Sequence, residues 1–208
     1  MNERPANCLL FVVSAASGAG KTTLVAQLLT TRPNLVRAIT CTTRPPRINE
    51  RDGVDYYFFL PEEFERRLAA GEFIENATVY GYRYGILRSE LLGKLRLGHD
   101  VLLNIDVQGC ATIRAQAQAD PELARALVMV FLTPPSRAVL EHRLRHRGTD
   151  APEVIAHRLE AARTEVAQWV HFDYLLISDT IAEDLRRASV IFEAEKMKQA
   201  RSQLPEGF

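Results

Sequence analysis

The feature that most constrains this chain is a loop of small residues between an apolar run and a helical pattern. The apolar run covers 9–13, and the loop reads Ala15-Ala16-Ser17-Gly18-Ala19-Gly20-Lys21-Thr22-Thr23. A strand, a small-residue loop, Lys-Thr and a helix, in this order, are typical of a phosphate-binding P-loop. Backbone N–H groups of such a loop surround phosphate oxygens, and the helix N-terminus adds about half a positive charge. We therefore predict that these nine residues bind the phosphates of a nucleotide.

Two residues of the loop carry side-chain chemistry, and one departs from the strict pattern. Lys21 is expected to reach the β- and γ-phosphates, and the Thr22 hydroxyl group is expected to ligate Mg²⁺. The strict pattern has glycine where this chain has Ala15, and a methyl group is tolerated there only if φ is negative. The alternative is a chance Gly-Lys-Thr in an ordinary loop, and the flanking strand and helix patterns argue against it.

Length and bulk charge narrow the class of protein. The 208 residues fit one domain, or one domain with insertions, and 47% hydrophobic residues suffice to fill a core. The 26 basic and 26 acidic residues cancel, which gives no indication of a nucleic acid partner. No segment approaches the length of a membrane helix, and the run 9–13 is interpreted as a first strand rather than a signal peptide. Nothing distinguishes a monomer from a homo-oligomer.

Cysteine and histidine residues form neither a disulfide framework nor a metal-binding pattern. The three cysteines, Cys8, Cys41 and Cys110, are odd in number and far apart, which favours a reducing, cytoplasmic setting. His142 and His146 are four residues apart, but no third ligand accompanies them, so they are interpreted as a surface pair.

Apolar runs alternate with amphipathic stretches, which predicts the α/β class with a parallel five-stranded sheet flanked by helices. The expected strands cover 8–14, 35–40, 100–106, 127–133 and 174–178. The expected helices between them cover 22–31, 90–97, 109–117, 136–147 and 183–198. The tail after residue 198 is expected to fray.

Two stretches interrupt this alternation. The span 40–86 is rich in Tyr, Phe, Arg, Gly and Pro, contains an expected short helix at 61–70, and is interpreted as an inserted, mixed β-rich lobe. The span 143–170 joins basic residues to a long amphipathic helix at 151–170, and is interpreted as a helical lid. The segments 1–39, 87–142 and 171–208 then form the core of a single domain, 1–208.

A second acidic group is expected at the end of a buried strand beside the P-loop. Asp106 follows the apolar stretch 101–105 and meets this expectation. Its carboxylate can hold Mg²⁺ through water or polarise a substrate. The alternative is that Asp106 only caps the helix that follows.

The inserted lobe carries arginines, tyrosines and an isolated carboxylate. Arg44 and Arg47 lie three residues apart in a proline-stiffened turn and can converge on one phosphate, with tyrosine hydroxyl groups completing the shell. Glu75 can accept two hydrogen bonds from one planar group, such as N1–H and the 2-amino group of guanine, whereas adenine presents an acceptor at N1. Taken alone, these residues fit a polar surface with structural tyrosines better than a binding site.

Taken together and in order, these motifs resemble the guanylate kinase family over nearly the whole chain. The resemblance is carried by SGAGKT at 17–22, TTRPPR at 42–47, ExxGxxYxF at 50–58, FIE at 73–75, YG at 84–85, IDxQG at 105–109 and RLxxRG at 143–148. It implies a P-loop nucleoside monophosphate kinase fold with a GMP-binding lobe and a lid. It also implies ATP-dependent phosphorylation of GMP, and of dGMP, in purine nucleotide metabolism.

The resemblance implies roles for individual residues. ATP, as its Mg²⁺ complex, would lie on residues 15–23. The residues at the GMP site would be Thr40, Arg44, Arg47, Glu50, Tyr56, Glu75, Tyr84 and Asp106. The residues that neutralise the transferred phosphoryl group would be Lys21, Arg143, Arg147 and Arg158. Catalysis would then rest on positioning and charge, without a general base.

Some positions depart from the family pattern. Ile86 stands where the family has Ser or Thr beside the guanine, so Ile86→Ser is expected to improve the use of GMP. Asn104 replaces an Asp near the metal side. Weakened guanine contacts leave a kinase of another small phosphate ester as an alternative function. A non-catalytic phosphopeptide-binding module is the second alternative, and the intact Lys21-Thr22 pair argues against it.

Overall fold

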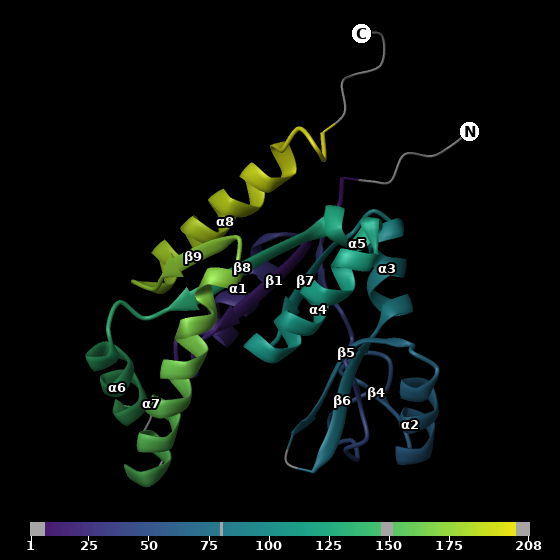
Figure 1. Cartoon of the computed structure of the whole chain (residues 1–208), viewed down its shortest axis with the longest axis horizontal. Coiled ribbons are helices and arrows are strands. Elements are labelled where there is room, and N and C mark those ends of the chain that lie inside the picture. Colours follow the sequence, from purple (N-terminus) through teal and green to yellow (C-terminus); the bar gives the residue numbers. More distant parts are fainter. Residues whose placement is uncertain (1–6, 80, 147–151, 203–208) are drawn as a thin grey trace, which may run out of the picture.

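The computed structural model describes residues 7–79, 81–146 and 152–202 of the chain. A sheet with helices on both faces forms the core, and a smaller β-rich unit and a pair of helices project from it (Figure 1). Within these ranges, no helix is both long enough and apolar enough to cross a membrane.

The core sheet contains five parallel strands in the order β2-β7-β1-β8-β9. These strands are β1 (Leu10–Ala15), β2 (Leu35–Arg37), β7 (Asp100–Asn104), β8 (Leu127–Thr133) and β9 (Tyr174–Ile177). β1 lies at the centre and is buried at every position, as a parallel strand covered on both faces must be. The predicted α/β class and the five-stranded parallel sheet are confirmed.

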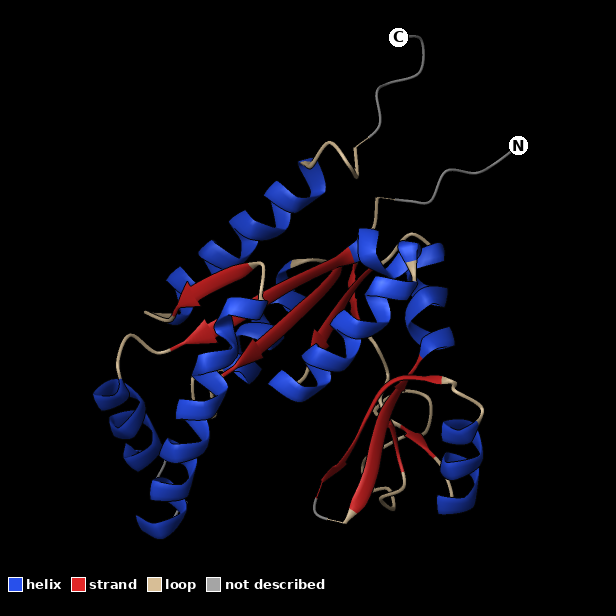
Figure 2. Ribbon diagram, in the orientation of Figure 1, coloured by secondary structure: helices blue, strands red, loops and turns tan. Residues whose placement is uncertain are grey.

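Alternate residues of β1 enter two apolar clusters, one on each face of the sheet. Phe11 and Val13 pack with residues of α1 (Lys21–Thr31) and α8 (Ile181–Met197). Leu10 and Val12 pack with residues of α3 (Arg88–Arg96), α4 (Val107–Ala119) and α5 (Pro121–Ala126). Figure 2 shows helices on both sides of the strands. The two-residue period of a strand therefore builds both layers of the core.

The inserted lobe is built on a four-stranded sheet in the order β4-β3-β6-β5. Its elements are β3 (Cys41–Thr42), β4 (Tyr57–Phe58), α2 (Pro61–Ala69), β5 (Phe73–Val79) and β6 (Tyr82–Leu87). β6 is antiparallel to both β3 and β5, whereas β3 and β4 are parallel, so the sheet is mixed as predicted. Phe64 of α2 stacks on Phe73 with ring centroids 4.4 Å apart, which gives the lobe an apolar cluster of its own.

Helices α6 (Arg137–His146) and α7 (Pro152–Ala167), with the short 3₁₀ helix η1 (Gln168–His171), cover the span predicted as a lid. Buried Leu140 and Leu144 of α6 and Ile155 and Leu159 of α7 belong to the same apolar cluster as the central strand. In Figure 1, this pair of helices and the inserted lobe project in the same direction from the two ends of the core.

One predicted strand is clearly shorter in the structure, and one helix was not predicted. The strand predicted over 35–40 ends at Arg37, because only 35–37 pair with β7 before the chain turns toward the inserted lobe. Helix α5 was not predicted, although Asp120 and Pro121 form a helix-start signal. The Asp120 carboxylate accepts hydrogen bonds from the backbone N–H groups of Glu122 and Leu123, both at 3.1 Å.

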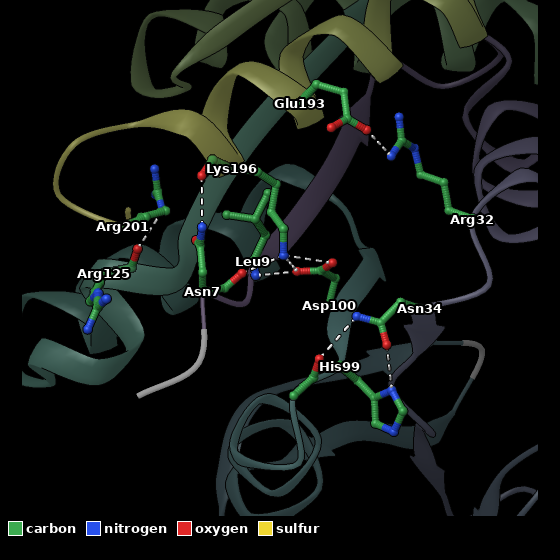
Figure 3. Close-up of polar contacts among 11 residues, drawn as sticks. Asn7, Leu9, Arg32, Asn34, His99, Asp100, Arg125, Glu193, Lys196 and Arg201 are labelled. Atoms are coloured by element: carbon green, nitrogen blue, oxygen red, sulfur yellow. Dashed lines mark hydrogen bonds and ion pairs between the residues drawn. The ribbon is translucent and has the colours of Figure 1, made fainter. Parts of the chain in front are cut away.

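The expectation that the tail frays after residue 198 is wrong for the described residues up to 202. Arg201 is buried and donates hydrogen bonds to the carbonyl oxygens of Arg125, at 2.9 Å, and Leu127, at 3.1 Å. Figure 3 shows the Arg125 contact, and beside it Lys196 forming an ion pair with buried Asp100 at 2.7 Å. These contacts attach the end of α8 to the amino-terminal ends of strands β7 and β8. A local sequence pattern cannot indicate contacts between segments so far apart.

Candidate active site

The loop between β1 and α1 has the backbone shape of a P-loop. Gly18 and Gly20 have φ values of 91° and 103°, in the left-handed region that favours glycine. A Cβ atom on Gly18 would also lie 2.8 Å from Leu144 Cδ2, so α6 packs directly against the loop. Ala15 is the last residue of β1, where an extended backbone accommodates its methyl group.

Lys21 extends from the start of α1 to the end of the neighbouring strand β7. Its Nζ atom donates a hydrogen bond to the carbonyl oxygen of Ile105 at 2.9 Å. Burial lowers the pKa of Lys21, and the nearby carboxylates of Asp106 and Glu165 oppose this shift. The structure thus brings Lys21 and Asp106 together, as expected for the carboxyl ends of adjacent parallel strands.

Asp106 caps α4, which is the alternative considered for it, yet it is also placed at the site. Its Oδ1 atom accepts a hydrogen bond from the backbone N–H of Gly109 at 2.8 Å. Its Oδ2 atom makes no hydrogen bond with any described residue, and the side chain is exposed. Asp106 therefore caps the helix and still presents one carboxylate oxygen.

Glu75 is a buried carboxylate at the junction between the lobe and the core. Its side chain lies against Gly109, where an added Cβ atom would be 3.2 Å from both Glu75 Cγ and Oε1. No described residue donates a hydrogen bond to this carboxylate, and only 8% of Glu75 is exposed. Burial, and secondly the charge of Asp106, raise the pKa of Glu75 to about 7. A ligand with paired N–H donors would satisfy this group.

Arg44, Glu50, Tyr56 and Tyr84 form one cluster in the lobe. Arg44 Nη2 lies 2.8 Å from both carboxylate oxygens of Glu50, and Glu50 Oε2 accepts the backbone N–H of Arg47 at 2.8 Å. The Arg44 guanidinium lies 5.5 Å from the centre of the Tyr56 ring, and the Tyr56 and Tyr84 ring centroids are 6.2 Å apart. Glu50 therefore orients Arg44. The side chain of Arg47 is exposed.

A cavity of about 470 Å³ lies beside the P-loop. Arg143 forms part of its wall and donates hydrogen bonds to Ala19 O at 3.3 Å, Ser178 Oγ at 3.0 Å and Asp179 O at 3.3 Å. Buried Asp184 accepts from Ser178 Oγ and from Asp179 N, both at 2.8 Å, which fixes that wall. The lining residues are Gly18, Ala19, Gly20, Thr23, Leu24, His142, Arg143, His146, Ser178, Asp179, Ile181 and Asp184.

Several lining residues were not predicted as site residues. His142 and His146 were interpreted as a surface pair, and they are exposed, with ring centroids 4.1 Å apart, but they also border this cavity. Asp184 lies in the first turn of α8, where an acidic residue is a common helix-start feature, so its sequence position alone does not mark a site.

The remaining predicted residues lie at the edges of the site. Thr40 is half-buried just before β3, and its carbonyl oxygen accepts the backbone N–H of Tyr57 at 3.0 Å. Arg158 is half-buried on α7. Arg147 lies outside the described residues. The structure also places Glu165, for which the sequence offered no signal, against the P-loop: its Oε2 atom accepts the Ser17 N–H at 2.8 Å.

Ile86 is a core residue as well as a neighbour of Glu75. It pairs with Glu75 across β5 and β6, is only 2% exposed, and belongs to the apolar cluster that contains Ile74 and Leu91. The effect expected of Ile86→Ser must therefore be revised, because a hydroxyl group at this position would replace buried methyl groups.

We now expect Ile86→Ser to destabilise the protein by about 2–5 kcal/mol, the range for emptying a large aliphatic site. Thermal or urea unfolding followed by circular dichroism measures this change. Ile48→Ser is the matched control, because Ile48 in the lobe is fully exposed, at 101%. An Ile86→Ser protein as stable as the Ile48→Ser protein would contradict the burial and restore the expectation of a simple gain in GMP use.

Comparison with known proteins places these features in one family. A family model described as guanylate kinase matches residues 8–195. The guanylate kinase of Novosphingobium aromaticivorans is 42% identical over 193 residues, covering 93% of this chain and 85% of that protein. The guanylate kinase of Neisseria meningitidis serogroup A is 45% identical over 195 residues, covering 92% and 90%. A crystal structure of guanylate kinase from Anaplasma phagocytophilum is similar with a TM-score of 0.69, 32% identity, and coverage of 93% and 89%.

Proposed function

We propose that this chain, which belongs to the guanylate kinase family, transfers the γ-phosphoryl group of ATP to GMP. Family membership makes it a nucleoside monophosphate kinase. The roles of its individual residues are proposed below. The observation that carries it is the buried Glu75 carboxylate, to which no described residue donates a hydrogen bond. Guanine supplies two parallel N–H donors for such a group, and adenine does not.

The P-loop and the cavity beside it are the proposed ATP site. The phosphates would lie on residues 15–23, chiefly on the N–H groups of the second half of the loop and the first turn of α1, and the cavity of about 470 Å³ would receive the adenosine. Arg143, expected among the residues that neutralise the transferred phosphoryl group, lines that cavity, so we now assign it to ATP binding along the cavity wall. The Lys21 side chain reaches Ile105 O, beside Asp106, where the transferred phosphoryl group would be located.

The lobe is the proposed GMP site. Arg44, held by Glu50, would bind the GMP phosphate with Arg47, Tyr56 and Tyr84. Glu75 and the hydroxyl group of Thr40 would contact guanine, and Asp106 would lie between the two substrates. None of these assigned contacts requires the ribose 2′-hydroxyl group, which supports dGMP as a second acceptor.

Phosphoryl transfer here needs positioning and charge rather than proton abstraction. A phosphate monoester has a second pKa of about 6, so the GMP phosphate is largely ionised near neutral pH. Lys21, Arg147 and Arg158 would neutralise the transferred group in line with the attacking oxygen. The GMP-binding lobe, 40–86, and the lid, 143–170, would then close over the core to exclude water. The core consists of segments 1–39, 87–142 and 171–208.

The residues present fit a magnesium ion. The Thr22 side chain is exposed at the first turn of α1, and Asp106 Oδ2 makes no hydrogen bond with a described residue. Mg²⁺ prefers such hard oxygen ligands and retains several waters. We propose that Thr22 holds it directly and Asp106 through water, and that the ion supplies charge neutralisation at the β- and γ-phosphates. The exposed Asn104 adds no charge there.

A panel of acceptors tests the proposal. GMP, dGMP, AMP, CMP and ribose 5-phosphate are incubated with ATP, Mg²⁺ and the protein, and ADP release is measured. GMP is expected to give the highest kcat/KM, followed by dGMP. A preference for ribose 5-phosphate would favour the sugar-phosphate alternative, and no turnover with any acceptor would favour the phosphopeptide-binding alternative. A cytoplasmic location remains a prediction.

The raised pKa of Glu75 predicts a pH dependence for the use of GMP. Only the carboxylate form accepts both guanine donors, and the pKa of Glu75 in the folded protein is about 7. Below pH 7, kcat/KM for GMP is therefore expected to fall by up to about tenfold per pH unit. The GMP phosphate titrates with a pKa of about 6 and adds its own dependence only at lower pH.

Steady-state rates between pH 5.5 and 8.5 check this dependence. KM for ATP in the same series serves as an internal control and is expected to stay nearly constant across pH 6.5–8. Glu75→Gln removes the titrating group, so its profile should keep only the phosphate step. A wild-type profile that is flat from pH 8 to 6.5 would contradict the role of Glu75.

A further inference from the structure

One contact between the lid and the P-loop is not used by the proposed mechanism. Glu165, on the last turn of α7, accepts a hydrogen bond from the backbone N–H of Ser17 at 2.8 Å. The two residues are 148 positions apart. Figure 1 shows α7 running from the far end of the lid back toward the sheet, so this contact lies at the fixed end of the helix.

The surroundings of the contact are packed. Leu159 and Ala162 of α7 are buried in the same apolar cluster as Ala15, Ala16 and Ala19. The C-terminal half of α7 is therefore seated on the P-loop by apolar contacts, and Glu165 adds the directional one. Ser17 lies in the loop between β1 and α1, and its backbone N–H donates to Glu165.

The position of Ser17 separates this contact from phosphate binding. The N–H groups that face a bound phosphate belong to the end of such a loop and the first turn of its helix. Ser17 precedes both left-handed glycines, Gly18 and Gly20, which turn the chain toward α1. Glu165 can hold the first half of the loop while the second half remains available to ATP.

A carboxylate beside a triphosphate site needs a reason, because its charge opposes ATP binding. The Ser17 N–H fixes the orientation of one peptide unit at the start of the loop, and a carboxylate is the strongest side-chain acceptor for it. Misplacing reacting groups by about 1 Å can cost roughly 10²-fold in rate. Burial lowers the pKa of Lys21, and the negative charge of Glu165 partly offsets this lowering.

We infer that Glu165 is a positioning residue, which clamps the Ser17 peptide of the P-loop to the base of the lid throughout the catalytic cycle. The clamp holds the base of α7, the helix that also carries the lid arginine Arg158, against the P-loop, so the lid closes about a fixed base. This inference rests on the phosphoryl transfer proposed above, since it names a residue that orients that site. It assigns Glu165 no contact with either substrate.

Kinetics of three variants test the clamp. Glu165→Ala is expected to lower kcat by about 10- to 100-fold, with KM for GMP within about twofold of wild type. Glu165→Gln keeps a carbonyl acceptor for Ser17 and is expected to recover most of the rate. Glu160→Ala is the matched control on the same helix, because Glu160 is exposed and forms a loose surface ion pair with Arg163 at 3.9 Å. This control is expected to keep the wild-type kcat.

A second measurement reports the contact itself. The ¹H–¹⁵N resonance of Ser17, followed with and without a non-hydrolysable ATP analogue, is expected to be shifted downfield and protected from exchange in both states. Glu165→Ala should remove the shift and the protection. An unchanged kcat in folded Glu165→Ala protein would overturn the clamp. Tighter ATP binding by this variant would also overturn it, because it would show that Glu165 competes with the ATP phosphates for the P-loop. Absence of GMP kinase activity in the wild type would refute the proposed function while leaving the resonance test valid.

Discussion

Lys21→Ala is expected to lower kcat between about 10²- and 10⁴-fold while the protein remains folded. Preorganised charge contacts to a transition state contribute about 3–5 kcal/mol, and removing the ammonium group removes one such contact. Lys21 reaches the end of β7 through its hydrogen bond to Ile105 O, so its amino group lies beside Asp106. Initial rates at saturating ATP and GMP measure the loss.

The fold of the Lys21→Ala protein is checked by circular dichroism and thermal unfolding. Its unfolding is expected near the wild-type temperature, because among the described residues Lys21 Nζ makes one hydrogen bond, to the carbonyl oxygen of Ile105. Thr30→Ala is a matched control on the same helix, since the Thr30 hydroxyl group is exposed and donates to Ala26 O within the helix. Turnover near the wild-type rate in a folded Lys21→Ala protein would refute the P-loop assignment.

Glu75→Gln is expected to abolish the preference for GMP over AMP. Each hydrogen bond to a charged acceptor contributes about 1.5–3 kcal/mol. In the glutamine variant the amide NH₂ group faces one of the two guanine N–H donors, so that hydrogen bond is lost, and the other is made to a neutral acceptor. The combined loss corresponds to roughly 10²- to 10⁴-fold in kcat/KM for GMP. The ratio of kcat/KM for GMP and AMP, measured at pH 8 where wild-type Glu75 is ionised, reports the change.

Stability provides an independent control for Glu75→Gln. The pKa of Glu75 in the folded protein is raised to about 7, so its ionisation destabilises the fold as the pH rises through that value. Removing the ionisable group is therefore expected to leave stability unchanged or improve it above pH 7. Glu65→Gln, at an exposed lobe carboxylate paired with Arg83, should alter neither stability nor selectivity. Full GMP selectivity in Glu75→Gln would show that the base pocket lies elsewhere.

Local patterns were sufficient for the elements that their own residues specify. β1, the P-loop glycines and the first turn of α1 follow each other within about a dozen residues, so spacing alone placed Lys21 and Thr22. The alternation of apolar runs and amphipathic stretches likewise predicted the parallel sheet, because burial on both faces imposes a continuous apolar strand. The mixed sheet of the lobe followed from the break in that alternation.

Contacts between distant segments required the tertiary structure. Ile86 reads as a departure from a family motif, and only the packing of β6 against the core shows that it fills an apolar cluster. Glu50 reads as one more site residue, and only the geometry pairs it with Arg44. Arg201 lies in a polar tail that local propensity assigns to solvent, yet it binds carbonyl groups more than 70 positions away.

The sequence by itself therefore determined the fold class, the P-loop and the residue types available for chemistry. The tertiary structure decided which of them meet: Glu75 with Gly109 and Asp106, and Glu165 with Ser17. The physical reason is that periodicity and glycine spacing act over one or two turns of chain, whereas burial, and the pKa shifts it causes, depend on side chains brought together from distant positions.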